Sequence, residues 1–172
     1  MSDIRHIDPT DDNHMMKAIL WTDIANSTGQ RVGATTDAWR HLWNAFYNLS
    51  EELVRRFGGD DIERKGDATL SIFEFPTQAV DCAIAVRADV QVLHLEVRIG
   101  LHFGMVERAP GGIDGLAVHF AARVVDVADA GEIIVSRLVR DLMLESRIRF
   151  EDKGLFKLKG IPEEQRLYAI AS

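Results

Sequence analysis

Two apolar, strand-like runs flank a short charged turn, and this pair constrains the fold more than any other feature of the sequence. Residues 60–75, DDIERKGDATLSIFEF, read as two strands joined at R-K-G, where Gly66 can adopt the backbone angles of a tight turn. A hairpin is the simplest antiparallel unit, so the rest of the chain is expected to supply further strands and the helices that cover them.

Helix and strand patterns alternate on both sides of this hairpin. Residues 17–24 form a short apolar run that predicts a buried strand. Residues 35–59 carry apolar side chains at three- and four-residue steps and predict a long amphipathic helix. Pro76 opens a second helix that extends to about Gln91. The remaining segments predict a half-buried strand at 95–104, a loop at 109–115, a helix at 116–128, a strand at 132–136, a short helix at 137–144 and two strands within 148–172.

The order β-α-β-β-α-β, followed by a C-terminal extension, predicts the α+β class and a ferredoxin-like sandwich. A chain of 172 residues has the size of one domain. We therefore expect a flexible N-terminal leader at 1–16 and one folded domain at 17–172.

The chain carries a net charge of −7, which argues against a nucleic-acid partner because such a surface needs clustered Lys and Arg. The charge does not exclude a phosphate ligand, since a bound metal ion can supply the positive charge. The N-terminal stretch has no apolar run, so we expect neither a signal peptide nor membrane insertion, and a cytoplasmic location. Cys82 is the one cysteine, and its apolar neighbours favour a buried structural thiol.

Two carboxylates are expected at one edge of the sheet. Asp23 ends the first strand and Asp67 follows the hairpin turn, and converging carboxylates of this kind suit Mg²⁺ or Mn²⁺ shared with a phosphate ligand. Each Asp alone could equally cap a strand end or a turn. The segment IANSTGQ, which contains Ser27 and Thr28, is small and polar, and its backbone amides could cradle phosphate oxygens.

Two basic residues could complete such a site. Arg123 follows His119 by four residues on a predicted helix, so the two side chains share one helix face. Lys159 stands just before a Gly-Ile-Pro turn. Taken alone, each cation fits a solvated charge. Together with paired acids they fit transfer at a phosphorus centre, where fixed cations stabilise the negative charge of the transition state.

The chain resembles the catalytic domain of the class III nucleotidyl cyclases, the adenylate and guanylate cyclase family, over about residues 17–171. The matching stretches, in the family's order, are WTDIANST, RFGGDDIERKGDATLSIF, VRIGLHFGMV, GLAVHFAARV, GEIIVS and FEDKGLFKLKGIPEEQRLYAI. The resemblance implies a nucleoside triphosphate substrate and a homodimer whose two active sites are each built from both subunits.

The resemblance also implies a role for each candidate residue. Asp23 and Asp67 match the aspartates that bind two divalent cations, Mg²⁺ or Mn²⁺, and the backbone carbonyl of Ile24 matches a third ligand. Arg123 matches the arginine that stabilises the transition state, and Lys159 the lysine that holds the outer phosphates. Both would act on the substrate held by the aspartates of the partner subunit. His119 stands where most members have asparagine, as in some bacterial relatives.

The base-reading positions depart from the adenylate cyclase pattern. Glu63 stands in place of a lysine and Gly112 in place of its aspartate partner. A carboxylate at 63 cannot donate to adenine N1, which argues against ATP. It can accept from guanine, as in guanylate cyclases, from uracil N3–H or from the cytosine amino group.

We favour a pyrimidine substrate for two reasons, and UTP, converted to cUMP, over CTP because Glu63 can face the N3–H that only uracil has. Gly112 lacks the small polar side chain that guanylate cyclases pair with their glutamate. The chain is also similar to the stand-alone pyrimidine cyclases of bacterial anti-phage (Pycsar) systems. Tyr47 is expected to narrow the base pocket.

Three alternatives stay open. The first is a guanylate cyclase. The second is a degenerate cyclase domain that only binds nucleotide or a partner protein: the altered base pair and His119 favour it, while the intact metal aspartates and cations oppose it. The third, an RNA-binding ferredoxin-like module, would need exposed aromatic side chains on basic strands, which residues 95–104 do not show.

Overall fold

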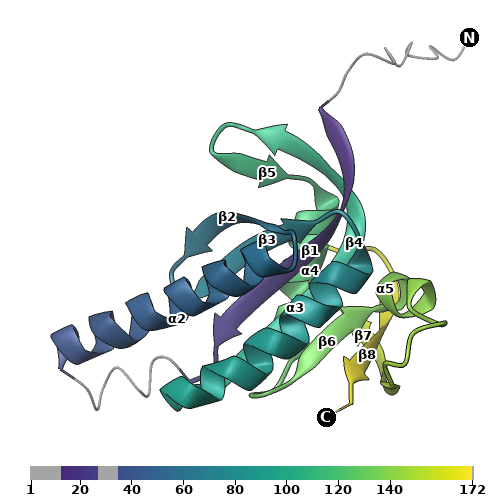
Figure 1. Cartoon of the computed structure of the whole chain (residues 1–172). Helices are drawn as coiled ribbons and strands as arrows, with labels where there is room; N and C mark the ends of the chain where they lie inside the picture. Colours follow the sequence, from purple (N-terminus) through teal and green to yellow (C-terminus); the bar gives the residue numbers. More distant parts are fainter. Residues whose placement is uncertain (1–12, 27–34, 172) are drawn as a thin grey trace, which may run out of the picture.

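A mixed eight-stranded sheet forms the centre of the structure, a computed structural model that describes residues 13–26 and 35–171 (Figure 1). Along the sheet the strand order is β2-β3-β1-β4-β6-β8-β7, and β5 pairs with β4. The strands are β1 (His14–Ile24), β2 (Asp60–Lys65), β3 (Ala68–Phe73), β4 (Val97–Ala109), β5 (Gly112–Asp114), β6 (Ile133–Ser136), β7 (Phe150–Lys157) and β8 (Glu164–Ile170).

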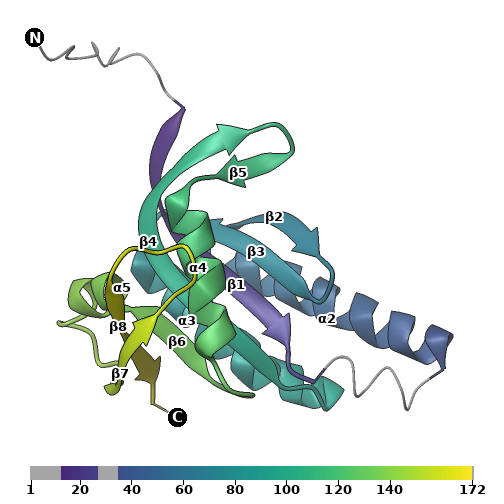
Figure 2. The same ribbon diagram turned by 180° about the vertical axis from the view of Figure 1, so that it is seen from behind.

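Helices cover both faces of this sheet. Helices α2 and α3 lie on one face, in front in Figure 1, and α4 crosses the other face, in front in Figure 2. Helix α4 also connects β4 to the parallel strand β6. The helical segments are α2 (Thr36–Arg56), α3 (Pro76–Asp89), the 3₁₀ turn η1 (Val90–Leu93), α4 (Leu116–Val127) and α5 (Arg137–Leu142).

The ferredoxin-like prediction is confirmed. The segments β1-α2-β2-β3-α3-β4 follow one another in the chain, and their strands lie in the order β2-β3-β1-β4 with antiparallel pairing throughout. Strand β1 begins at His14, three residues before the predicted start, because its first residues pair with the far end of β4. Residues 112–114, expected within a loop, form β5 because β4 continues to Ala109 and turns back on itself.

From Ala18 onward, strand β1 is buried on both faces of the sheet. Leu20 packs toward α2 and α3, while Ile19 and Trp21 pack in the cluster that includes α4. The run 95–104 shows the expected burial of Leu95, Val97, Ile99 and Leu101 on one face, but its other face is also partly covered. Helix α4 covers its second face so closely that a Cβ added to Gly100 would lie 2.4 Å from the backbone nitrogen of Val125.

Helix α2 has clear signals at both ends. The side chain of Thr35 accepts a hydrogen bond from the backbone nitrogen of Ala38 at 3.2 Å, which caps the first turn. At the other end Gly58 adopts a φ of 76°, and its nitrogen donates to the carbonyl of Arg55 at 3.1 Å. These two caps fix the length of the helix, which lies in front of the sheet in Figure 1.

The thiol of Cys82 lies in the core between α3 and the sheet and is completely buried. Burial raises the pKa of this thiol to about 12, so it stays protonated and unreactive in the folded protein. The prediction of a structural cysteine is confirmed. No helix in the described part of the chain is both long enough and apolar enough to cross a membrane.

Gly100→Ala tests the close packing of α4 on β4. The added methyl would collide with the backbone of Val125, which cannot move aside without shifting the whole helix. We expect the free energy of unfolding to fall by about 1–3 kcal/mol, measured by urea denaturation. Met105→Leu, on an exposed part of the same strand, is the control and should leave it nearly unchanged.

The partly buried imidazole of His102 should make the free energy of unfolding depend on pH in a specific way. The ring stacks on Phe120 with ring centroids 4.1 Å apart, its Nδ1 lies 2.9 Å from the Ser136 hydroxyl, and burial lowers its pKa to about 4. Between pH 6.5 and 4 the unfolded chain binds this proton and the folded chain does not, so stability falls by up to about 3 kcal/mol as the pH drops. Urea titrations at pH 7 and pH 4.5 should show a smaller loss for His102→Gln, whereas an equal loss in both proteins would contradict this account.

Candidate active site

The two predicted metal aspartates lie side by side at one end of β1. Asp23 pairs in register with Ala68, the residue that follows Asp67. The backbone nitrogen of Ile24 donates to the carbonyl of Asp67 at 3.2 Å, which holds the hairpin turn against the end of β1. Asp23 lies on the same sheet face as Trp21, the face that α4 covers. The structure therefore brings together the two acids that the sequence pattern paired.

An arginine that the sequence analysis did not single out forms an ion pair with Asp23. Arg98, opposite Asp23 on β4, forms an ion pair with its carboxylate. The Asp23 side chain is only 18% exposed, and burial raises the pKa of this carboxyl above its ordinary value. The Arg98 guanidinium opposes the rise, while the charges of Asp67 and Asp126 add to it. The site therefore concentrates negative charge that a cation would relieve.

The residues present fit a divalent ion that is shared with a phosphate ligand. Asp23 and Asp67 provide hard carboxylate oxygens on adjacent segments, and the carbonyl of Ile24 is next along the chain. Within residues 13–26 and 35–171, no three His, Cys, Asp or Glu side chains gather into a ligand set of their own. Mg²⁺ usually completes a coordination shell of this kind with water and substrate phosphates.

The base-reading candidates lie on neighbouring strands. Glu63 on β2 is exposed and stands opposite Leu70, whose side chain belongs to the cluster on the α4 face. Gly112 begins β5, which lies in contact with β2. The structure thus places Glu63 on the sheet face that also carries Asp23, and brings the strand of Gly112 beside it.

Tyr47 lies elsewhere than the sequence analysis expected. It belongs to α2, on the opposite sheet face, and its hydroxyl donates to the carbonyl of Gly66 at 2.8 Å. Arg64, which neighbours Glu63 and points to the other face of β2, lies over the Tyr47 ring at 4.6 Å. Tyr47 therefore contacts the back of the hairpin and not the face that bears Glu63.

The two predicted residues on α4 point away from the sheet. His119 is exposed, and its Nε2 lies 3.4 Å from a carboxylate oxygen of Asp114. Arg123 is 40% exposed and forms an ion pair of 3.0 Å with Asp126 on the same helix. The shared face predicted from the four-residue spacing is confirmed, and it is a face that a second molecule can reach.

Lys159 lies on the other flank of α4 from the aspartates. It occupies the turn between β7 and β8, where it is exposed and follows the buried Leu158. Leu158 packs in a cluster with Val124 of α4 and with strands β6 and β8, whereas the aspartates lie toward β1 and β3. In one chain, α4 therefore stands between Lys159 and the aspartates. Figure 2 shows α4 between the β7–β8 turn and the end of β1.

Ser27 and Thr28 lie outside the described residues, so their predicted contact with phosphate stays a prediction.

Arg98 is the residue that sequence reasoning missed. The alternation of 95–104 placed it on the same strand face as Gly100, but only the register between β1 and β4 reveals that it meets Asp23.

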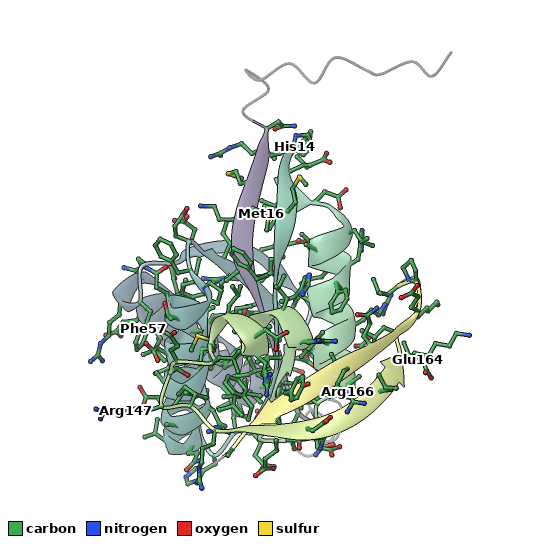
Figure 3. The ribbon with its side chains drawn as sticks, turned by 90° about the vertical axis from the view of Figure 1, so that its right-hand side faces the viewer. His14, Met16, Phe57, Arg147, Glu164 and Arg166 are labelled. Carbon is green, nitrogen blue, oxygen red and sulfur yellow. The ribbon has the colours of Figure 1, made fainter. Side chains whose placement is uncertain are left out.

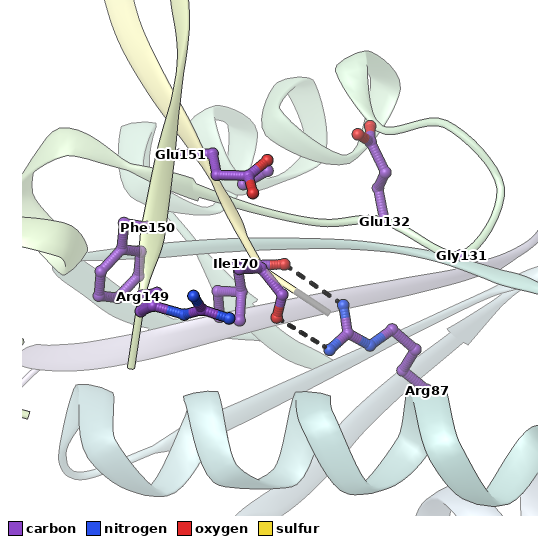
Figure 4. A pocket seen from close by; sticks show the side chains of 9 residues that line it. Arg87, Gly131, Glu132, Arg149, Phe150, Glu151 and Ile170 are labelled. Carbon is purple, nitrogen blue, oxygen red and sulfur yellow. Dashed lines mark hydrogen bonds between the residues drawn. The ribbon is translucent and has the colours of Figure 1, made fainter. Parts of the chain in front are cut away.

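A cavity of about 500 Å³ lies away from these residues, where β7 and β8 meet α3 (Figure 4). Arg87 donates there to the carbonyls of Ile170 and Ala171 at 3.4 and 3.5 Å. Arg149 and Glu132 also line it, and none of the predicted site residues does. Arg87, on α3, holds the end of β8 through these hydrogen bonds. Because the lining contains none of the predicted site residues, this cavity is not the candidate active site.

Comparison of the sequence with known families gives one clear match. The profile described as "Adenylate and Guanylate cyclase catalytic domain" matches residues 11–172. The serine/threonine-protein kinase pkn2 of Myxococcus xanthus is 27% identical over 87% of this chain and 19% of its own length. An adenylate cyclase of Lachancea kluyveri is 29% identical over 69% of this chain and 8% of its own length. The chain thus spans less than two thirds of the length of these curated relatives.

Solved structures share the fold over almost the whole chain. The adenylyl cyclase CyaB from P. aeruginosa superimposes with a TM-score of 0.87 at 23% identity, covering 92% of this chain and 95% of that one. An adenylate/guanylate cyclase/hydrolase from Silicibacter pomeroyi gives 0.83 at 26% identity, covering 92% and 98%. The guanylate cyclase domain of RhGC from Catenaria anguillulae, in complex with GTP, gives 0.81 at 19% identity, covering 93% and 97%. With its fold and nearly its whole length matched, this chain belongs to the adenylate and guanylate cyclase catalytic domain family.

Proposed function

We propose that this chain converts a nucleoside triphosphate into a 3′,5′-cyclic nucleotide and pyrophosphate. The observation that carries the proposal is the pairing of Asp23 and Asp67 at the end of β1, within a cyclase fold, on the sheet face that α4 crosses. Two carboxylates that need further oxygen ligands suit ions that arrive with a triphosphate. Two divalent cations, Mg²⁺ or Mn²⁺, would lower the pKa of the ribose 3′-hydroxyl and neutralise phosphate charge when bound there.

The chain's own residues would hold and polarise the substrate. In the proposed reaction the ribose 3′-oxygen bonds to the α-phosphorus, the bond from that phosphorus to the pyrophosphate oxygen breaks, and the 3′-hydroxyl proton passes to water. Arg123 would stabilise the negative charge that builds on the α-phosphate, and Lys159 would hold the outer phosphates. His119, one helical turn before Arg123, would contact the ribose or phosphate from the same helix face.

Arg98 would add a cation at the metal end of the site. It already pairs with the Asp23 carboxylate, so its guanidinium would lie close to a phosphate that shares a metal ion with Asp23. When a metal ion binds the Asp23 carboxylate, the N–H groups of the Arg98 guanidinium can donate hydrogen bonds to a phosphate instead. Ser27 and Thr28 follow Ile24 in the sequence, and we propose that they contact the phosphates as well.

We propose a homodimer with two shared active sites. In one chain the aspartates and Lys159 lie on opposite flanks of α4, and Arg123 is paired with Asp126, so one chain does not assemble the full set of charges. The paired ends of β1 and β4 project from the body of the domain, with His14 at the tip and Met16 further along β1 (Figure 3). Met16 and Met105 face each other there and are 49% and 56% exposed, which offers apolar contact area to a second copy.

The choice of base rests on Glu63 and Gly112. Glu63 is exposed and can accept a hydrogen bond from a ring N–H of uracil or guanine, while adenine N1 offers only a lone pair. Gly112, on the strand beside β2, offers no side chain to a purine amino group. We propose UTP as the preferred substrate and GTP as the second candidate. A signalling role in anti-phage defence rests on the resemblance to stand-alone pyrimidine cyclases alone.

A turnover assay with ATP, GTP, CTP and UTP in the presence of Mn²⁺ tests the choice of base. We expect cUMP as the main product, identified by mass spectrometry, and a drop of about 10- to 100-fold in kcat/KM for UTP in Glu63→Gln, because a charged acceptor is lost. GTP as the only good substrate would establish a guanylate cyclase instead. No product from any of the four would support a domain that only binds nucleotide.

Complementation between two inactive variants tests the shared sites. Asp67→Asn should abolish turnover without unfolding the protein, because it removes a metal ligand's charge at constant volume, and Arg123→Ala should lower kcat more than it raises KM. An equal mixture should recover about a quarter of wild-type activity, since half of the dimers are mixed and each has one intact site.

Asp89→Asn, at the end of α3 on the other side of the sheet, is the matched control and should retain full activity. Mixed dimers that form without any recovery would refute sites built from two chains. Full activity in Asp67→Asn would refute the metal role of that aspartate.

A further inference from the structure

Helix α2 holds the tip of the β2–β3 hairpin through one tyrosine. The hydroxyl of Tyr47 donates to the carbonyl of Gly66, at a distance of 2.8 Å, and Gly66 directly precedes Asp67. The Tyr47 ring stacks on Trp43 of the same helix, with ring centroids 4.6 Å apart. A ring that is already stacked loses little freedom when its hydroxyl bonds, so Tyr47 is preorganised for this contact.

A second contact ties the same hairpin to the same helix. The guanidinium of Arg64 lies 4.6 Å from the centre of the Tyr47 ring and pairs with the carboxylate of Glu51 at 3.2 Å. Glu51 also lies 3.6 Å from Arg55, one turn further along α2. Tyr47, Arg64 and Glu51 therefore form one connected set between the helix and the back of β2, which we name the hairpin tie.

The turn depends on this tie because it has little packing of its own. Gly66 adopts a φ of 59°, and a Cβ added to it would meet no atom within 4 Å, so the tip projects into open space. Its position is fixed from two sides: Tyr47 holds the Gly66 carbonyl, and the Ile24 nitrogen holds the Asp67 carbonyl at 3.2 Å. These two successive carbonyls orient the peptide units on both sides of the Asp67 Cα and so direct its side chain.

We propose that Tyr47 is a positioning residue that sets Asp67 against Asp23 for binding the divalent cations. The inference rests on the proposed function, and it gives Tyr47 a role different from a wall of the base pocket. The tie has a second effect, because Glu63 and Arg64 are adjacent on β2 and point to opposite faces. Because Arg64 is held against α2, the neighbouring Glu63 is held on the other face. The hairpin tie therefore positions both Asp67 and the base-reading carboxylate of Glu63.

Tyr47→Phe removes the hydroxyl and keeps the ring, so it tests the hydrogen bond alone. The matched control is Tyr168→Phe on β8, where Arg140 likewise lies over the ring, at 5.2 Å, near the opposite edge of the sheet. Three readouts separate the outcomes: hydrogen exchange of the backbone amides of residues 63–70, affinity for Mn²⁺ measured by electron paramagnetic resonance with and without inorganic tripolyphosphate, and the melting temperature.

In Tyr47→Phe we expect faster exchange of the hairpin amides and Mn²⁺ binding weakened by about tenfold, as for other residues that orient a metal ligand. The melting temperature should hardly change, because the contact lies at the surface and outside the core. Tyr168→Phe should change neither the exchange of this hairpin nor Mn²⁺ affinity. Arg64→Met, which keeps the aliphatic stem and removes the charge, should shift exchange and affinity in the same direction as Tyr47→Phe.

Unchanged exchange in both Tyr47→Phe and Arg64→Met would refute the hairpin tie. Faster exchange with unchanged Mn²⁺ affinity would refute the positioning role while leaving the tie in place. A wild-type protein that binds no Mn²⁺ under either condition would overturn the proposed function and the metal role of Tyr47 together, and the exchange data would still decide separately whether the tie exists.

Discussion

The pairing of β1 with both of its neighbours is the constraint on which the rest of the structure depends. Its register sets Asp23 opposite Ala68 on one side and opposite Arg98 on the other. Because side chains alternate between the faces of a strand, a slip of one residue would turn Asp23 toward α2 and α3. The apolar residues of β1 prevent this slip. Leu20 packs in the core on one sheet face and Trp21 in the core on the other, and a slip would move each side chain to the opposite face.

Helix α4 divides the second face of the sheet into two regions with different charge. Toward β1 and β3 lie the paired aspartates, and toward β6 and β8 lies the turn that carries Lys159. Arg123 projects outward between them. One chain therefore carries the paired acids and the exposed Lys159 on opposite flanks of α4. The proposed homodimer would bring the acids of one copy to the cations of the other across a two-fold axis.

Sequence reasoning identified the elements well but not their contacts. The period of the apolar residues predicted α2 and β4, and the R-K-G turn predicted the hairpin, because local chemistry fixes these features. Arg98 and Tyr47 show where it fails. Arg98 matters because it meets Asp23 across a strand pair, and Tyr47 contacts Gly66 because of how α2 packs on the sheet. Both contacts depend on tertiary register, which a one-dimensional pattern does not contain.

The buried thiol of Cys82 gives the molecule an internal reporter. Because the side chain has no exposed area and burial raises the pKa of its thiol to about 12, a maleimide or iodoacetamide cannot alkylate it at neutral pH while α3 stays docked on the sheet. Because the chain has a single cysteine, the rate of covalent labelling reports how often the core around Cys82 opens to solvent. Ligand or partner binding that tightens the domain would slow this labelling without any engineered probe.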